Sequence, residues 1–265
     1  MNLRVSYAGG YRAPQAFDED MHIAVVGGKR VRIRLADDLK EERSHSVSLS
    51  ADLYHNFGRV QTNLLVEGFY TILDDVFALR DLEDTDDGGK IKERYNGSGA
   101  AVRGFNVEGR AIFTRWFELQ AGVTLQQSRY KEPEQWSEDA DVPPVRRMFR
   151  TPDAYGYFTA SFKPVRNFTA DLTGTCTGSM LVQHMAGSGV AQDAAVSTPS
   201  FFDMNVRLSY DLHIYKEITL QLYGGVQNLF NAYQKDFDKG ADRDSGYIYG
   251  PSLPRSWFVG AKFSF

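Results

Sequence analysis

Apolar and polar residues alternate one by one along much of this chain. The clearest example is segment 202–212, where apolar side chains from Phe202 to Leu212 are separated by polar ones such as Asp203 and Arg207. Successive side chains of a β-strand point to opposite faces, so a period of two predicts a strand with one apolar and one polar face. The same alternation predicts nine further strands, at 3–7, 46–53, 60–71, 98–110, 117–126, 155–163, 167–176, 217–227 and in a last segment that ends at Phe265.

The lengths of these segments and of the links between them favour a membrane barrel. Several segments run to about 9–11 residues, enough to cross a bilayer at a tilt, whereas strands of soluble sandwiches are commonly about five or six residues long. Short and long links follow one another in strict alternation, which is typical of an antiparallel up-and-down barrel with short periplasmic turns and long outer loops. The short links lie near 56–59, 113–115, 163–166 and 213–216, and the long ones near 9–43, 74–97, 130–153, 182–200 and 229–255.

This order of links fixes the direction of the strands and the role of their faces. The first strand runs outward and the last runs inward, so Phe265 is expected on the periplasmic side. The polar faces carry charged residues such as Asp171 and Glu118, which are costly in a closed core and tolerated on the wall of a wet lumen. The apolar faces then meet lipid, and aromatic residues near strand ends fit interfacial girdles: Tyr54, Phe57, Trp116, Tyr130, Tyr210, Tyr233 and Trp257.

Composition removes several other classes of protein. A net charge of −4 over 265 residues argues against a nucleic-acid binder, which normally has a basic excess. The one cysteine, Cys176, excludes an intramolecular disulfide and a cysteine-based metal cluster. No run of about 18 apolar residues predicts a membrane-spanning helix, and the first residues have no apolar signal-peptide core. With no recognisable nucleophile–base set, we predict a protein that is not an enzyme and has no cofactor.

Three segments resemble those of one family when they are taken in order. Segment 6–19, "SYAGGYRAPQAFDE", is similar to a strand-then-loop box with an aromatic residue before Arg-Ala-Pro. Segment 36–53, "ADDLKEERSHSVSLSADL", resembles the box Asn-Pro-Asn-Leu-x-Pro-Glu-x-Ser, although only its leucine, glutamate and serine pattern is kept. Segment 224–265 is similar to a closing strand, Asn-Leu-Phe-Asn, a loop, Gly-Pro, Pro-Arg and a final strand ending in Phe. Together they resemble the TonB-dependent outer-membrane receptors.

This resemblance implies an outer-membrane transport receptor of a Gram-negative bacterium, which is energised through TonB and takes up a scarce ligand such as an iron chelate, haem or cobalamin. Family members combine a plug domain with a barrel of twenty-two strands. With about ten strands and no plug or signal peptide, residues 1–265 are expected to be the C-terminal part of such a barrel, and this part alone is expected not to transport. The family's partners would be outer-membrane lipid, TonB through the missing N-terminal region, and the barrel-assembly machinery through Trp257, Val259, Phe263 and Phe265.

The resemblance also predicts where a small-molecule ligand binds. In receptors of this family, contacts come from outer-loop and upper-lumen residues, often aromatic residues or arginine. The matching residues here are Tyr11, Arg12, Tyr247 and Tyr249. His22 lies between the first two boxes, where haem receptors of the family carry an axial ligand, and neutral imidazole is a good ligand for haem iron. A solvated loop histidine is the other interpretation of His22.

No metal site is predicted from the acidic residues. Asp84, Asp86 and Asp87 precede two glycines, as in a calcium loop, but the distal glutamate at the required spacing is missing. We therefore interpret this segment as a solvated loop tip. Segment 236–244, "DFDKGADRD", is interpreted in the same way because Lys239 and Arg243 balance much of its charge.

Two other functions stay open at this point. An autonomous ten-stranded outer-membrane protease would need acidic residues facing a histidine at the barrel mouth. The candidates are His22 and His184 with Asp37, Asp38 or Asp193, and the sequence does not pair them. A soluble binding module would need the apolar faces to be buried against a second layer, which the one-sided placement of the long loops does not favour.

Overall fold

The computed structural model describes residues 1–265 except 16–30, 85–89, 216–217 and 252. The described part is built of β-strands, and it contains no helix of the length and apolarity that a membrane span needs. The strands are β1 (Asn2–Arg12), β2 (Val31–Leu35), β3 (Glu42–Phe57), β4 (Val60–Asp74), β5 (Phe77–Asp84), β6 (Lys90–Asn96), β7 (Ala100–Thr114), β8 (Phe117–Glu134), β9 (Val145–Arg147), β10 (Ala154–Phe162), β11 (Phe168–Thr177), β12 (Leu181–His184), β13 (Ala194–Ser197), β14 (Phe201–Tyr215), β15 (Ile218–Gln227) and β16 (Ser256–Ser264).

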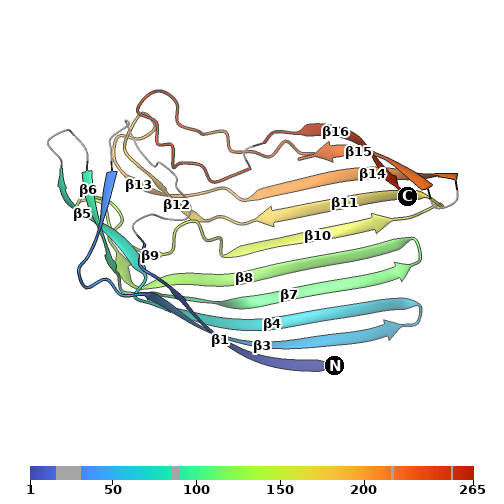
Figure 1. The fold of residues 1–265 in the computed structure, drawn as a ribbon, viewed down its shortest axis with the longest axis horizontal. Helices are drawn as coiled ribbons and strands as arrows, with labels where there is room; N and C mark the ends of the chain where they lie inside the picture. Colours follow the sequence, from blue (N-terminus) through green and yellow to red (C-terminus); the bar gives the residue numbers. More distant parts are fainter. Residues whose placement is uncertain (16–30, 85–89, 216–217, 252) are drawn as a thin grey trace.

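One large antiparallel sheet forms a curved wall (Figure 1). Its hydrogen-bonded order is β1-β3-β4-β7-β8-β10-β11-β14-β15-β16, with the short β9 paired to β8. These ten strands are the ten that the alternation predicts. Each is followed along this path by the next one in sequence, so the up-and-down topology is confirmed. The sheet is not closed into a barrel, because β1 and β16 are the two ends of the path.

The apolar sides of the strands form one continuous face. Directly opposite residues of paired strands share a face, and the register aligns Leu49 with Gly68, Gly68 with Phe105, and Phe105 with Leu125. Leu49, Phe105 and Leu125 are 58%, 64% and 55% exposed, although burying such a side chain is worth about 1.5–3 kcal/mol in water. No second layer covers them. Few apolar side chains are buried in the described part, namely Ala36, Ala100, Val142, Ala160, Val182 and Tyr247.

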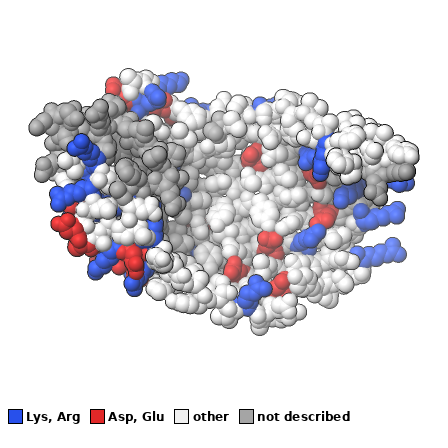
Figure 2. Space-filling model, viewed as in Figure 1, with Lys and Arg blue, Asp and Glu red and all other residues white. Residues whose placement is uncertain are grey.

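The opposite face is polar, and its side chains bond to one another across the strands. Gln120 donates to Glu108 across 2.8 Å, and Ser161 donates to Asp171 across 2.7 Å. Figure 2 shows the hollowed side of the sheet with acidic and basic side chains scattered along it. A hollow of about 730 Å³ on this face is lined by Asp171, Arg207, Gln221 and neighbouring residues. Such a surface suits a water-filled lumen, and the apolar face suits lipid.

Tight turns join the strands at one end of the wall. The link between β3 and β4 is Gly58 and Arg59, and Gly58 adopts a left-handed φ of 63°, which costs glycine little. Trp116 lies in the β7–β8 turn, beside Phe117, whose ring stacks on that of Phe162 with centroids 4.6 Å apart. The C-terminus lies at this same end (Figure 1). The predicted direction of the last strand is therefore observed.

The structure agrees with the predicted aromatic girdle for only some of its residues. Phe57, Tyr210 and Trp257 lie on the apolar face, opposite Val60, Leu222 and Val226 respectively. For Tyr54 and Tyr130 the prediction is wrong. Tyr54 pairs with Asn63 on the polar face and donates to Asp52 across 2.9 Å, and Tyr130 pairs with the buried Ala100. Position near a strand end does not tell which face a ring occupies.

Several strands extend beyond the predicted segments at the end that carries the long loops. Segment 46–53 is part of β3 (Glu42–Phe57), and segment 117–126 is part of β8 (Phe117–Glu134). The added residues include Arg43 and Lys131, so the alternation of apolar and polar side chains stops there while backbone pairing continues. Two further small sheets, β2-β6-β5 and β12-β13, belong to segments that we interpreted as loops.

The effect of a charge placed on the apolar face should distinguish a membrane-embedded wall from a soluble sheet. Val123 pairs with Val107 in the middle of β8, and Thr124 is its neighbour on the polar face. We expect Val123→Arg to lower the free energy of unfolding from a bilayer by about 2–4 kcal/mol, because the arginine would face hydrocarbon. The measurement is the denaturant midpoint of the receptor that contains this wall, reconstituted in phospholipid vesicles.

Thr124→Arg is the matched control, since it adds the same side chain one residue away on the wet face. It should leave the midpoint nearly unchanged. Equal shifts for the two variants would contradict the assignment of the faces.

Candidate ligand-binding site

The loop between β15 and β16 is fixed to the wall by asparagine side chains. Asn228, which has a left-handed φ of 51° at the end of β15, donates to the carbonyl oxygens of Ala232 and Leu253 across 2.9 and 3.0 Å. Asn231 accepts the backbone N–H of Arg255 at 2.9 Å. The Asn-Leu-Phe-Asn box therefore closes the base of this loop, where asparagine tolerates φ > 0 and bonds to nearby backbone groups.

Two tyrosines and one carboxylate meet further out in this loop. Tyr249 donates its hydroxyl to both oxygens of Asp236, at 2.6 and 2.7 Å, and Tyr247 donates to one of them at 3.0 Å. Beneath them, the fully buried Gln234 accepts the backbone N–H of Tyr249 and donates to the carbonyl oxygen of Tyr247. The two predicted tyrosines are thus brought together, with Asp236 between them.

These contacts shift the protonation equilibria of all three groups. Burial opposes ionisation of Asp236, but the hydrogen bonds from Tyr249 and Tyr247 outweigh it and lower the pKa of this carboxyl. Burial, together with the hydrogen bond to Asp236 and its negative charge, raises the pKa of Tyr247 to about 12. The same causes raise the pKa of Tyr249. At neutral pH the group holds one negative charge, shared between two hydroxyl donors.

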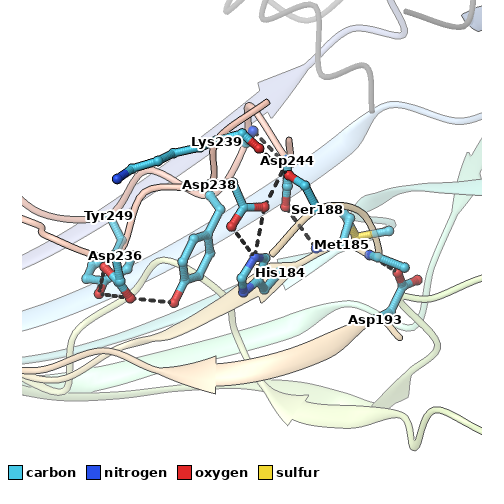
Figure 3. A network of polar contacts seen from close by, with 12 residues as sticks. His184, Met185, Ser188, Asp193, Asp236, Asp238, Lys239, Asp244 and Tyr249 are labelled. Atoms are coloured by element: carbon cyan, nitrogen blue, oxygen red, sulfur yellow. Dashed lines mark hydrogen bonds and ion pairs between the residues drawn. The ribbon is translucent and has the colours of Figure 1, made fainter. Parts of the chain in front are cut away.

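A second contact fastens this loop to the β12–β13 hairpin. His184, at the end of β12, bonds through Nε2 to both carboxylate oxygens of Asp238 at 3.0 and 3.1 Å, and only 8% and 4% of these side chains are exposed. The imidazole stacks on Tyr247 with ring centroids 3.6 Å apart. The backbone N–H of Met185 bonds to Asp244 at 2.8 Å (Figure 3). The tyrosine pair therefore rests on a fixed, partly buried support.

Exposed cations lie on this loop and beside it. Arg150 donates to the carbonyl oxygens of Ile248 and Gly246, so its guanidinium lies against the tyrosine segment. Lys239 and Arg243, on the same loop, are exposed. Aromatic rings, phenol groups and cations together can hold an anionic, aromatic small molecule.

The other predicted binding residues lie elsewhere. Tyr11 pairs with Arg43 on the outward, apolar face of β1, at the far edge of the sheet from β16. Arg12 lies on the other face of β1, with its guanidinium carbon 5.6 Å from the centroid of the Phe77 ring. His22 lies outside the described residues. The binding roles of Tyr11, Arg12 and His22 stay predictions.

The sequence did not identify the residues that hold this site together. Segment 236–244 was interpreted as a solvated loop tip, but Asp238 is buried and Asp244 accepts two backbone N–H groups near its own position and at Met185. His184 was considered only as a candidate residue of the alternative protease, with Asp37, Asp38 or Asp193 as its partner. The only signal was the density of aspartates and tyrosines in one loop, because His184 and Asp238 are separated by 54 residues.

The described residues do not support the protease. His184 contacts Asp238 and not the predicted Asp37, Asp38 or Asp193, and both partners are covered. Asp193 instead accepts the hydroxyl of Ser137 and a backbone N–H. Within the described part, no group of three or more His, Cys, Asp or Glu residues could hold a metal ion. Asp86 and Asp87 of the calcium-like segment lie outside that part.

The contact between Asp236 and its tyrosines should depend on pH in a defined window. The lowered pKa of Asp236 means that its stabilising contribution is lost as pH falls below the ordinary value of 3.8. The raised pKa of Tyr247 means that its contribution is lost as pH rises from the ordinary 10.0 toward about 12. In an ultraviolet tyrosinate titration, Asp236→Asn should move the late ionisation from about 12 toward 10.0.

Asp242→Asn serves as the control, since the exposed Asp242 is in the same loop and neither tyrosine bonds to it. Its titration should match that of the wild type. Burial also raises the pKa of Tyr247 and is kept in Asp236→Asn, so an ionisation that does not move at all from its wild-type pH would refute the contact.

Comparisons with known proteins agree with this fold. A family model, "TonB dependent receptor-like, beta-barrel", matches residues 1–229. The ferric-catecholate import receptor Fiu from K12 E. coli has 16% identity and a TM-score of 0.62, over 98% of this chain and 32% of that one. A mutant of the ferric enterobactin receptor PfeA from Pseudomonas aeruginosa has 16% identity and a TM-score of 0.66, over 98% and 37%. The FrpB iron transporter from Neisseria meningitidis has 16% identity and a TM-score of 0.61, over 98% and 36%.

These solved structures share the fold of the wall, and the chain spans about a third of the length of each. No curated protein sequence matches it. TonB-dependent receptors are transporters and not enzymes, in agreement with the lack of a recognisable catalytic set in the sequence. The chain belongs to the TonB-dependent receptor β-barrel family.

Proposed function

We propose that this chain forms the C-terminal part of the barrel of an outer-membrane receptor, energised through TonB, that imports a ferric chelate. The observation that carries the proposal is the wall itself: ten antiparallel strands with one continuous apolar face and one hydrogen-bonded polar face. The apolar face would meet the lipid of a Gram-negative outer membrane. TonB would act through the plug side of the receptor, and the barrel-assembly machinery through β16, which carries Trp257, Val259 and Phe263.

The ten strands would work only as part of a larger barrel. β1 and β16 are not paired with each other, and lipid offers no partner for the backbone groups of an open edge. Further strands have to complete the wall before it can enclose a pore. The ten-strand wall alone is therefore expected not to transport.

The ligand class is proposed from the chemistry of the tyrosine pair in the β15–β16 loop and the cations near it, which we call the mouth. Tyr249 and the exposed Arg150 and Lys239 offer a ring and cations to an anionic aromatic chelate. Among the structures with the same fold, Fiu is a ferric-catecholate import receptor and PfeA is a ferric enterobactin receptor. A ferric catecholate combines negative charge with aromatic rings. Haem and cobalamin are the other ligands that the family resemblance suggests.

Removing the cation or the ring should weaken binding of a ferric catecholate. We expect Arg150→Gln and Tyr249→Leu, in the complete receptor, each to raise the Kd about tenfold, the loss of roughly one charged hydrogen bond or ring contact. Quenching of tryptophan fluorescence by ferric enterobactin measures it. Arg166→Gln, which removes an exposed arginine from the turn between β10 and β11, is the control and should bind as the wild type does.

Wild-type affinity in both variants would remove this mouth from the proposal. No uptake of any ferric chelate by the wild-type receptor would remove the proposed function as a whole.

Haem is tested separately through His22. If this residue ligates haem iron, titration of the complete receptor with haem should give a Soret shift that is lost in His22→Ala. The same shift in both proteins would leave His22 as a loop residue. We expect no such shift for a ferric catecholate receptor.

A further inference from the structure

Three oxygen-bearing side chains meet at one point of the mouth. The hydroxyl of Tyr249 lies 2.6 and 2.7 Å from the two carboxylate oxygens of Asp236, and the hydroxyl of Tyr247 lies 3.0 Å from one of them. The two rings meet edge to face, with their centroids 5.2 Å apart. Figure 3 shows Tyr249 and Asp236 facing each other. A small, hard metal ion prefers oxygen ligands of this kind.

The spacing of these oxygen atoms matches the coordination shell of such an ion. In an octahedron with metal–oxygen bonds of about 2.0 Å, neighbouring ligand oxygens are about 2.8 Å apart. Each phenol oxygen lies between 2.6 and 3.0 Å from a carboxylate oxygen of Asp236, with the hydroxyl protons as the present link. An ion could therefore take the place of these protons with little movement of the oxygen atoms.

The surrounding residues hold both tyrosines in this position. Gln234, which is 1% exposed, accepts the backbone N–H of Tyr249 at 2.8 Å and donates to the carbonyl oxygen of Tyr247 at 3.0 Å. Tyr247 is 4% exposed and stacks on the imidazole of His184. Neighbours that orient the ligands in this way are a general property of metal sites. Asp236, in contrast, is exposed, so an ion could enter from the side of the carboxylate.

The phenol groups restrict which ion can bind. A metal ion binds the deprotonated form of a ligand, and an ordinary phenol loses its proton only near pH 10. A strongly polarising trivalent ion is needed to displace two such protons at neutral pH, and magnesium or calcium cannot do so. Ferric iron is such an ion, and tyrosine serves elsewhere as an axial ligand of haem iron. Two phenolates and one carboxylate would also balance the charge of a ferric ion.

We propose that Asp236, Tyr247 and Tyr249 form a binding site for a ferric ion. The ion replaces the two phenol protons, which are released to solvent, and the iron stays ferric. The three protein oxygens leave about half of an octahedral shell open. The exposed Arg150 and Lys239 would attract an anionic chelator whose oxygens fill this half. The inference deepens the proposed function and rests on it for the source of the iron. A contact that only stabilised the loop would need just one of the two hydroxyls.

The test uses the complete receptor, purified in detergent without its ligand, with ferric nitrilotriacetate as the probe. Tyrosinate bound to ferric iron gives a charge-transfer band in visible light, and resonance Raman spectra excited in this band show the vibrations of the tyrosinate ring. We expect the wild type to bind iron with this band. Asp236→Asn and Tyr249→Phe should each raise the Kd for the ferric ion by about 100-fold or more, because losing only an outer hydrogen-bond partner of a ligand costs about 10–100-fold.

Two features of the variants separate iron ligation from other effects. Tyr249→Phe keeps the aromatic ring and removes only the phenol oxygen, so it does not test ring contact with a catecholate. Tyr233→Phe is the matched control, since it removes the same atom in the same loop from a tyrosine whose ring lies 5.7 Å from the Nζ atom of Lys235. It should keep both the iron and the band. Heat-modifiable mobility on a gel shows whether each variant is folded.

A wild type that binds no iron, or that binds it without the charge-transfer band, would overturn the inference. So would a wild-type Kd in the folded Asp236→Asn or Tyr249→Phe variant. These results would leave the proposed function intact, because a receptor can import a ferric chelate without ligating its iron. A receptor that shows the band but takes up no ferric chelate would instead overturn the proposed function.

Discussion

The structure depends on one constraint: within a bilayer, the backbone N–H and C=O groups of the wall can bond only to one another. Nothing in hydrocarbon replaces a lost hydrogen bond, so each strand is paired along its length with its neighbour on the path. That pairing fixes the register, and the register puts every apolar residue of a row on the same side. The apolar face and the polar face are therefore consequences of the paired backbone, and they meet lipid and water respectively.

Outside the bilayer the constraint is relaxed, and the chain satisfies its backbone differently. The β15–β16 loop is long and its described residues form no strand, yet Asn228, Gln234 and Asp244 bond to its backbone groups. The buried contact between His184 and Asp238 then joins it to the β12–β13 hairpin. A loop held in this way presents Tyr249 in a defined position, which a loop held only by its two ends would not.

The wall could be predicted from the sequence because its signal is local. A period of two is visible in any single strand, so Phe202–Tyr215 is recognisable without its partners. The candidate site could not be predicted in the same way. His184 and Asp238 meet only after the chain has crossed the membrane twice, and nothing near either residue marks the other. The strand ends beyond the lipid were missed for a related reason, since pairing continues there after the alternation has stopped.

The outer rim shows how one set of strands is adapted to several surroundings. Along β7, Phe105 faces hydrocarbon, and Arg103, two residues away on the same face, is oriented by Gln127 where the apolar rows end. Two rows further out, Lys131 and Asp74 pair beyond the apolar band. From the middle of the wall toward the long loops, the outward face thus carries first apolar side chains, then a cation without an acidic partner, then an ion pair. This order follows the falling hydrocarbon content of the membrane in that direction, because an unpaired cation is stable only where anionic head groups or water can reach it. The polarity of the side chains on the outward face therefore changes with their depth in the membrane, whereas the side chains of the inward face are polar because they meet water.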